Sequence, residues 1–113
     1  MGQMVAQLAR LAGAQVLVSE PDAARRELAR RLGADAAIDP TRESLAEWVA
    51  AQTGGAGVDA AWETAGRPAP LADCLAAVRE SGAVVMVGVN GGEAALSLPL
   101  YRFHRRQLRL QGV

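Results

Sequence analysis

The regular alternation of short apolar runs with amphipathic, helix-forming segments constrains this chain more than any other feature. Short, mainly apolar runs are typical of short buried strands, and the candidate strands lie at Val16–Val18, Ala36–Ile38, Val58–Glu63 (in which Asp59 and Glu63 are acidic) and Ala83–Val87. Strands that alternate with helices through short, glycine-marked connections are typical of a parallel sheet with helices on both faces. We therefore expect one α/β domain over residues 1–113, because domains usually have roughly 100–200 residues.

Apolar residues at helical spacing predict four longer helices, each followed by glycine. They begin near Met4, at Asp22, at Pro40–Thr41 and after Gly66, and they end at Gly13, at Gly33, at the 54–57 glycine cluster and at Ser81–Gly82. Leu96 and Leu98 alternate on an expected exposed edge strand over 94–98, and a last strand is expected over 107–111. The chain begins inside a helix, whereas a domain of this kind begins with a strand.

Charge and hydropathy exclude several kinds of partner. Twelve basic and 12 acidic residues give a formal net charge of zero, so counterion release does not favour binding to nucleic acid, and an acidic membrane surface is disfavoured likewise. The apolar run Ala83–Val87 is far shorter than the roughly 20 residues of a membrane helix. Gln3, Gln7 and Arg10 interrupt the apolar residues near the N-terminus, so this segment does not resemble a signal peptide. We expect a cytoplasmic protein without membrane contact.

Missing residue types exclude several chemistries. Every basic residue except the single histidine is arginine, and a chain without lysine is neither a Walker-type phosphate binder nor a Schiff-base enzyme on its own. One cysteine, Cys74, excludes an internal disulfide and a cysteine-rich zinc site. His104 has no acid or cysteine cluster at metal-ligand spacing, so no metal site is expected in this chain.

Six fragments in register resemble the cofactor domain of medium-chain, zinc-type alcohol and polyol dehydrogenases. The fragments are Gly2–Ala9 with Gly13–Ala14, Val16–Glu20 with Arg25, Leu32–Asp35, Val58–Gly66, Val87–Val89 and Leu108–Gly112. Their order and spacing match across nearly the whole chain. The resemblance implies a Rossmann-like parallel sheet flanked by helices, in a family that moves hydride between an alcohol and nicotinamide with the help of zinc.

The same resemblance implies a domain truncated at both ends. In the family a strand and a G-x-G-x-x-G turn precede this first helix, and Gly2 corresponds to the last glycine, so the first strand and most of the turn are expected to be absent. The family's strand order, 3-2-1-4-5-6, places that strand between Val16–Val18 and Val58–Glu63. We expect direct pairing of these strands, a strand from another chain, or only marginal stability. The zinc-binding catalytic domain is expected to be absent.

Three residues in the first half are candidate contacts for the adenosine side of NAD. Gly2 lies at a helix start, where backbone N–H groups and the helix dipole favour a pyrophosphate. Glu20 follows Gly2 by 18 residues, close to the roughly 20 at which a carboxylate accepts the ribose hydroxyls, and it repels the 2′-phosphate of NADP. The resemblance adds Arg25 beside the ribose. The alternative interpretations are an ordinary residue after the start methionine for Gly2, a helix-opening acid for Glu20 and a solvated arginine for Arg25.

Four residues in the second half are candidate contacts for the nicotinamide side. Val87, Gly88 and Val89 lie where a central strand ends, at the edge where open α/β sheets bind ligands. In the family this backbone holds the nicotinamide carboxamide. Thr64 belongs to the 63–66 segment that lines the family's cofactor cleft. A strand that simply ends at a glycine, with Glu63 as a capping acid, explains the same residues.

Several functions remain open on the sequence. In the first interpretation, the chain is the NAD-binding part of a zinc-type dehydrogenase. It then has no catalytic residue of its own and is expected to be inactive in isolation. Alternatively, it is a non-catalytic dinucleotide-binding module that serves a separate catalytic domain, or an inactive remnant that self-associates as a homo-oligomer through the 94–98 edge. A methyltransferase shares the acid after the second strand but does not explain Val87–Val89 and Gly112.

Overall fold

The computed structural model describes residues 1–88, 91–93 and 95–113, and the chain divides into two compact units. The units are Met1–Trp48 and Val49–Val113. The single domain expected over residues 1–113 stays a prediction. No helix in the described part of the chain is long and apolar enough to cross a membrane.

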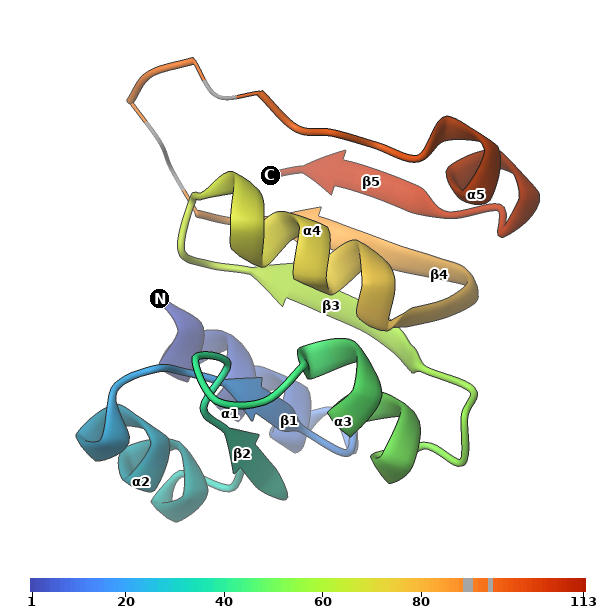
Figure 1. Cartoon of the computed structure of the whole chain (residues 1–113). Helices are drawn as coiled ribbons and strands as arrows, with labels where there is room; N and C mark the ends of the chain where they lie inside the picture. Colours follow the sequence, from blue (N-terminus) through green and yellow to red (C-terminus); the bar gives the residue numbers. More distant parts are fainter. Residues whose placement is uncertain (89–90, 94) are drawn as a thin grey trace. The chain divides into compact units, whose positions relative to one another are not determined.

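The first unit contains a two-stranded parallel sheet (Figure 1). Its elements are α1 (Gly2–Leu11), β1 (Leu17–Ser19), α2 (Ala23–Arg31), β2 (Ala36–Ile38) and the first residues of α3 (Leu45–Gln52). The strands pair with Leu17 opposite Ala36, and α2, which connects them, packs on both. These strands and helices confirm the predicted order, with β1 displaced by one residue.

The helix α2 begins where the sequence predicts, at Asp22. The Asp22 carboxylate accepts a hydrogen bond from the Arg25 amide at 2.8 Å, which satisfies one of the amides that a helix start leaves without a partner. Ala29 on α2 and Ile38 on β2 are almost fully buried. The core of this unit is therefore small, and it lies where α2 covers the sheet.

The helix α1 leaves its apolar stripe uncovered. The side chains of Met4, Leu8 and Leu11 are exposed, and α1 buries no residue. Polar contacts attach it to the rest of its unit instead: Gln3 donates to the Arg25 carbonyl at 3.1 Å, and Arg10 pairs with Asp35 at 3.1 Å. Helical periodicity predicts this helix correctly but does not predict what covers it.

The second unit contains a three-stranded parallel sheet in the order β3-β4-β5 (Figure 1). Its elements are β3 (Val58–Glu63), α4 (Pro68–Ala77), β4 (Val78–Met86), α5 (Leu100–Arg105) and β5 (Arg109–Gly112). The helix α4 packs on β3 and β4. Leu71 and Leu75 of α4 meet Val78 and Val84 of β4 in the buried core.

The helix α4 ends earlier than its glycine signal predicts. It stops at Ala77 rather than at Ser81–Gly82, and β4 begins at once. Val78 is fully buried and pairs with Val58, and the next pairing is Ala83 with Ala60, so residues 79–82 bulge out of the ladder. Burial of the Val78 side chain outweighs the helical preference of the residues that follow.

The exposed edge strand predicted over 94–98 is wrong. Residues 95–99 form no strand, and Ala94 lies outside the described residues. Leu96 and Leu98 are half-buried and pack against the core of the second unit. Their alternation reflects contact with that core rather than a free strand edge, whereas self-association through this segment stays a prediction.

The described strands do not close into one sheet. The strands β1 and β3, expected to pair directly across the missing position, belong to different sheets, so direct closure is wrong. Every observed pairing is parallel. Within each unit, the strands follow one another in sequence order, β1-β2 in the first and β3-β4-β5 in the second.

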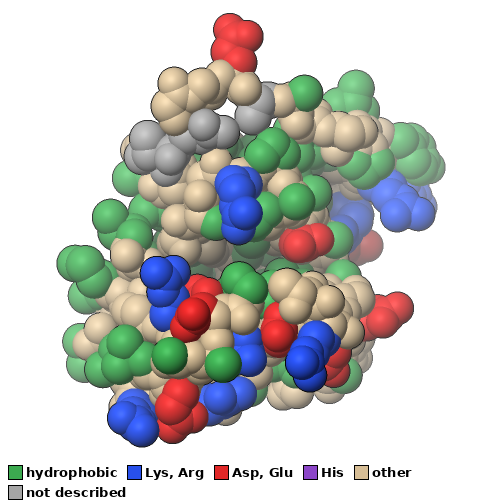
Figure 2. Space-filling view, turned by 60° about the vertical axis from the view of Figure 1, so that its left-hand side comes forward, with side chains coloured by type: hydrophobic (Ala, Val, Ile, Leu, Met, Phe, Trp, Pro, Cys, Tyr) green, Lys and Arg blue, Asp and Glu red, His purple; other side chains and the backbone are tan. Residues whose placement is uncertain are grey.

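Opposite charges balance locally on the surface. Arg10 pairs with Asp35, Arg26 with Asp39 and Arg79 with Asp59. Figure 2 shows acidic and basic side chains interspersed on the face it presents. These pairs account for part of the balance between the acidic and basic residues of the sequence.

We expect Gly57→Ala to destabilise the second unit more than Gly55→Ala. Both glycines have φ near +90°, so either alanine costs about 1 kcal/mol of backbone strain. Only at position 57 would the added Cβ lie 2.8 Å from backbone atoms of Ala77 and Arg79, which adds about 1–3 kcal/mol. Urea unfolding of both variants measures the difference, and equal losses would contradict the predicted clash.

Candidate functional site

The carboxyl ends of β3 and β4 meet at one edge of the second unit. Glu63 ends β3 and lies opposite Met86, the last residue of β4. The amides of Val87 and Gly88 then both donate to the Glu63 carbonyl, at 2.8 and 2.9 Å. Because parallel strands share one carboxyl edge, segments that are distant in sequence lie together here, and ligands of open α/β sheets bind at such an edge.

The Glu63 carboxylate is buried and bonds to the next turn of its own chain. Its side chain accepts hydrogen bonds from the amides of Ala65 at 2.7 Å and Gly66 at 3.0 Å. Only 3% of the residue is exposed. A buried charge requires such partners, and no ion pair involves Glu63 in the described part of the chain. These hydrogen bonds to the amides of Ala65 and Gly66 agree with the alternative interpretation of Glu63 as a capping acid.

Gly88 lies directly against Gly66. A Cβ placed on Gly88 would lie 2.1 Å from the Gly66 nitrogen, so only glycine allows this approach. Gly66 itself has φ +72°, a conformation that favours glycine. Thr64 is half-buried in the same turn. The structure therefore brings together the predicted contacts Thr64, Val87 and Gly88, while Val89 lies outside the described residues.

In the first unit, Glu20 follows the last residue of β1. Its amide donates to the Ile38 carbonyl at 3.0 Å, and its half-buried carboxylate accepts from the Asp22 amide at 3.0 Å. The side chain thus lies between the end of β1 and the start of α2. This location is the one that the spacing from Gly2 predicts.

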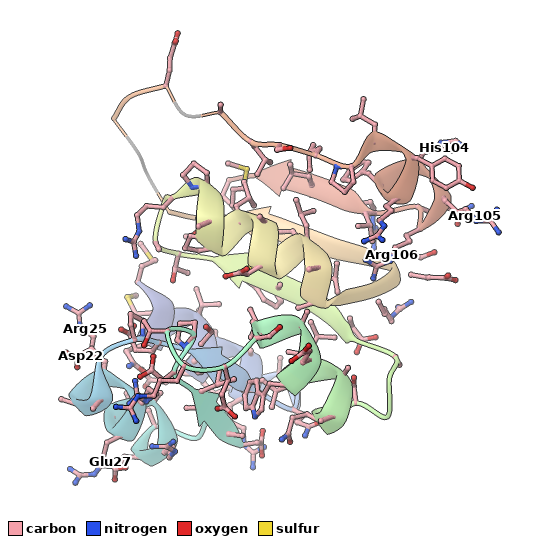
Figure 3. The ribbon with its side chains drawn as sticks, viewed as in Figure 1. Asp22, Arg25, Glu27, His104, Arg105 and Arg106 are labelled. Atoms are coloured by element: carbon pink, nitrogen blue, oxygen red, sulfur yellow. The ribbon has the colours of Figure 1, made fainter. Side chains whose placement is uncertain are left out.

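Gly2 opens α1, Arg25 lies in the first turn of α2, and Gln3 connects the two helix starts. Gln3 donates its side-chain amide to the Arg25 carbonyl. Arg25 itself is exposed, and Figure 3 shows its side chain pointing away from the ribbon beside Asp22. The first intrahelical donor of α1 is the Met4 amide, so the amides at the start of α1 are available to an anion.

Arg26 is a residue of this region that the sequence interpretation missed. Its guanidinium donates to the carbonyls of Glu20 and Pro21, both at 2.8 Å, and lies 3.5 Å from the Asp39 carboxylate. It therefore holds the loop that carries Glu20. The available signal was spacing, because Arg26 lies three residues before the buried Ala29 and thus on its face.

Asp39 follows β2, next to Arg26, and its environment favours the charged form. Thr41 donates both its hydroxyl, at 2.6 Å, and its amide, at 2.9 Å, to the carboxylate. These bonds lower the pKa of Asp39, and the positive charges of Arg26 and Arg42 add to the effect. The negative charge that orients Arg26 therefore persists below the usual pH range of an aspartate.

Cys74 is not a nucleophile at neutral pH. Burial raises the pKa of its thiol to about 12, and the negative charges of Glu63 and Asp73 act in the same direction. The thiolate is the reactive form of cysteine, and it is scarce under these conditions. The half-buried side chain acts as a small hydrophobe.

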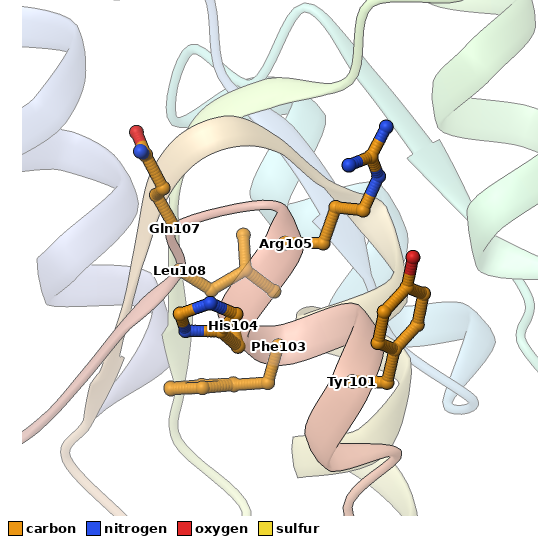
Figure 4. A pocket seen from close by; sticks show the side chains of 6 residues that line it. All are labelled: Tyr101, Phe103, His104, Arg105, Gln107 and Leu108. Atoms are coloured by element: carbon orange, nitrogen blue, oxygen red, sulfur yellow. The ribbon is translucent and has the colours of Figure 1, made fainter.

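A shallow hollow of about 610 Å³ lies beside α5, apart from the predicted site residues (Figure 4). Its lining includes Tyr101, His104 and Arg105 but none of the predicted cofactor contacts. Arg106, on the neighbouring turn, donates to carbonyls of Leu75 and Val78 at the end of α4 (Figure 3). That arginine therefore caps α4, whose last carbonyls need partners.

The described residues do not fit a zinc ion. Among them, no group of three or more histidine, cysteine, aspartate or glutamate side chains could hold a metal. His104 lies on α5 with arginines as its close neighbours in sequence. Zinc ligation needs three or four such side chains around one point.

Comparison with known proteins gives a match along the whole chain. A family model described as zinc-binding dehydrogenase matches residues 1–113. The 2-dehydro-3-deoxy-L-galactonate 5-dehydrogenase of Pseudoalteromonas atlantica is 35% identical over 98% of this chain and 32% of its own length. The sorbitol dehydrogenase of Bacillus subtilis is 36% identical over 87% of this chain and 28% of its own. The chain thus spans about a third of the length of the curated relatives it matches.

Solved structures show the same relationship in three dimensions. A protein of Sinorhizobium meliloti 1021, described as a zinc-binding dehydrogenase bound to NADP, superimposes with a TM-score of 0.89 and 31% identity. The match covers 98% of this chain and 33% of that one. The alcohol dehydrogenase of Aeropyrum pernix gives a TM-score of 0.88 at 27% identity, over 98% of this chain and 31% of that one.

We expect Thr41→Val to raise the pKa of Asp39, because the substitution removes the hydroxyl bond that lowers it most. A lowered pKa stabilises the fold above the ordinary value of 3.8, and that contribution is lost as the pH falls through the pKa of the folded state. The variant should therefore be less stable than the parent at pH 7, with a difference that shrinks below pH 3.8.

Carbon NMR titration of the Asp39 carboxyl and unfolding at several pH values test this expectation. Thr41→Ser keeps the hydroxyl and serves as the control. An unchanged Asp39 titration in Thr41→Val would show that the hydroxyl bond is not the main cause.

Proposed function

This chain belongs to the zinc-binding dehydrogenase family, and we propose that it forms the part of such an oxidoreductase that binds a nicotinamide dinucleotide. The observation that carries the proposal is the family match over all 113 residues. The whole enzyme would act on alcohol or polyol CH–OH groups, as the names of the sorbitol and alcohol dehydrogenases suggest. The nicotinamide supplies the hydride chemistry.

We assign the adenosine half of the dinucleotide to the first unit. The start of α1 at Gly2 offers backbone amides and the positive end of the helix dipole to the pyrophosphate. The Glu20 carboxylate, at the end of β1, accepts hydrogen bonds from the ribose hydroxyls. The exposed Arg25 guanidinium is free to turn toward the adenosine.

We assign the nicotinamide half to the second unit. The backbone of Val87 and Gly88 and the turn that contains Thr64 form the carboxyl edge of β3 and β4. Backbone groups at such an edge are suited to the planar carboxamide, which both donates and accepts hydrogen bonds. Val89 is the fourth candidate contact for the nicotinamide that the sequence predicts.

The proposal favours NAD over NADP. The Glu20 carboxylate would face the 2′-position, where a phosphate adds negative charge. Arg26, the nearest guanidinium to the Glu20 backbone, already binds two carbonyls and Asp39, so it does not offset that repulsion. The Sinorhizobium meliloti relative is bound to NADP, which makes Glu20 the residue to test.

Catalysis would require residues beyond those described. The donor set does not fit zinc, and we propose that the metal and the alcohol bind in a catalytic domain that this chain serves, in the cytoplasm. The 113-residue chain alone should then turn over no alcohol. A self-associating, non-catalytic module is the second candidate, and the uncovered apolar stripe of α1 is the observation that favours it.

We expect the chain to bind NAD more tightly than NADP, and Glu20→Ala to weaken NAD binding. Loss of hydrogen bonds to a charged acceptor costs about 1.5–3 kcal/mol, or at least about tenfold in Kd. The repulsion of the 2′-phosphate should disappear as well, so the preference for NAD should shrink. Calorimetric titration of each variant with NAD and with NADP measures both effects.

Glu27→Ala is the matched control, because Glu27 is an exposed acid on α2 that, among the described residues, forms ion pairs with Arg30 and Arg31 only. It should leave both affinities unchanged. Absence of binding by a parent chain shown to be folded would reject the cofactor-binding proposal. Equal affinity for both nucleotides in the parent would reject the preference for NAD alone.

A further inference from the structure

We propose that Glu63 is the positioning residue of the nicotinamide half-site: its buried carboxylate sets the backbone of the 64–66 turn, and its carbonyl sets the backbone of Val87 and Gly88. The inference rests on the proposed function, since it concerns the edge to which we assign the nicotinamide. Glu63 itself touches no cofactor in this role. It acts through the two backbone segments that would.

The side chain of Glu63 controls the first segment. Its carboxylate binds the amides of Ala65 and Gly66, so the turn closes on the residue that precedes it. Ala65 is exposed, and water would satisfy its amide equally well in an open turn. The buried carboxylate therefore selects the closed conformation, and Thr64 is held within it.

The main chain of Glu63 controls the second segment. Its carbonyl accepts from Val87 and Gly88 together, just beyond the last pair of the β3–β4 ladder, Glu63 with Met86. One residue thus connects both candidate cofactor segments. A change in its conformation would move both.

The contact between the two segments leaves no room for adjustment. Gly88 approaches Gly66 so closely that even a methyl group would overlap the backbone. An open 64–66 turn would therefore change the position available to Gly88. Distortion at the carboxylate is transmitted by this contact to the backbone that would hold the carboxamide.

Stability alone does not require a carboxylate at position 63. Removing an acceptor costs stability only as far as its donors are left without a partner, and the amides of the exposed Ala65 and the half-buried Gly66 can turn to water instead. The leucine variant therefore separates the two roles, because it preserves volume at the end of β3 while removing the acceptor. Glutamine keeps one acceptor oxygen for the two amides now bonded to Oε1.

The test is calorimetric titration of the 113-residue chain with NAD, on the parent and on Glu63→Leu, Glu63→Gln and Asp73→Asn. We expect Glu63→Leu to raise Kd about tenfold or more and Glu63→Gln to restore most of the affinity. Asp73→Asn removes an exposed charge from the same unit and should change nothing. Amide hydrogen exchange, followed by NMR, should speed up at Ala65 and Gly66 in the leucine variant.

The outcomes separate this inference from the proposed function. A parent chain that binds NAD, with a folded Glu63→Leu variant that binds it equally well, overturns the positioning role alone. Unchanged amide exchange at Ala65 and Gly66 in that variant also overturns it. If the folded parent does not bind NAD, the proposed function fails and the nicotinamide role of Glu63 fails with it. If Glu63→Leu does not fold, the test of the positioning role rests on Glu63→Gln. A folded Glu63→Gln variant that binds NAD tenfold more weakly than the parent would contradict the expected rescue by its remaining acceptor oxygen.

Discussion

Parallel pairing of strands is the constraint on which the rest of each unit depends. A parallel ladder requires the chain to return to its starting edge between strands, and this return takes the form of a covering helix. The helix α2 makes this return between β1 and β2, and α4 makes it between β3 and β4. This arrangement separates the buried core from the candidate site residues. The core lies under the covering helix, whereas the turns that follow the strands lie at the carboxyl edge of each unit's own sheet.

In each unit, one acidic or basic side chain holds the turn that follows a strand. Glu63 binds the turn after β3 with its carboxylate, and Arg26 binds the loop after β1 with its guanidinium. Each satisfies backbone groups that the ends of strands leave without ladder partners. At each predicted half-site, one acidic or basic side chain with a definite orientation thus orders the backbone.

Local chemistry explains why most of the elements were predictable. The runs 58–63 and 36–38 are observed as β3 and β2, because a short run of mainly apolar residues between turn signals favours a buried strand over a helix. The N-cap Asp22 marks the start of α2 correctly. The end of α4 was not predictable in this way, since Val78 leaves the helix to fill a core position that exists only once β3 is in place.

By itself, the sequence determined the order of strands and helices, the location of Glu20 after β1 and the family to which the chain belongs. These depend on local spacing, capping and motifs, which act over a few residues. Only the tertiary structure showed that Leu96 and Leu98 cover a core instead of forming an edge, that Arg26 faces inward, and that Gly88 touches Gly66. Each of these is a contact between segments distant along the chain, and periodicity within one segment carries no information about the surface that the other presents.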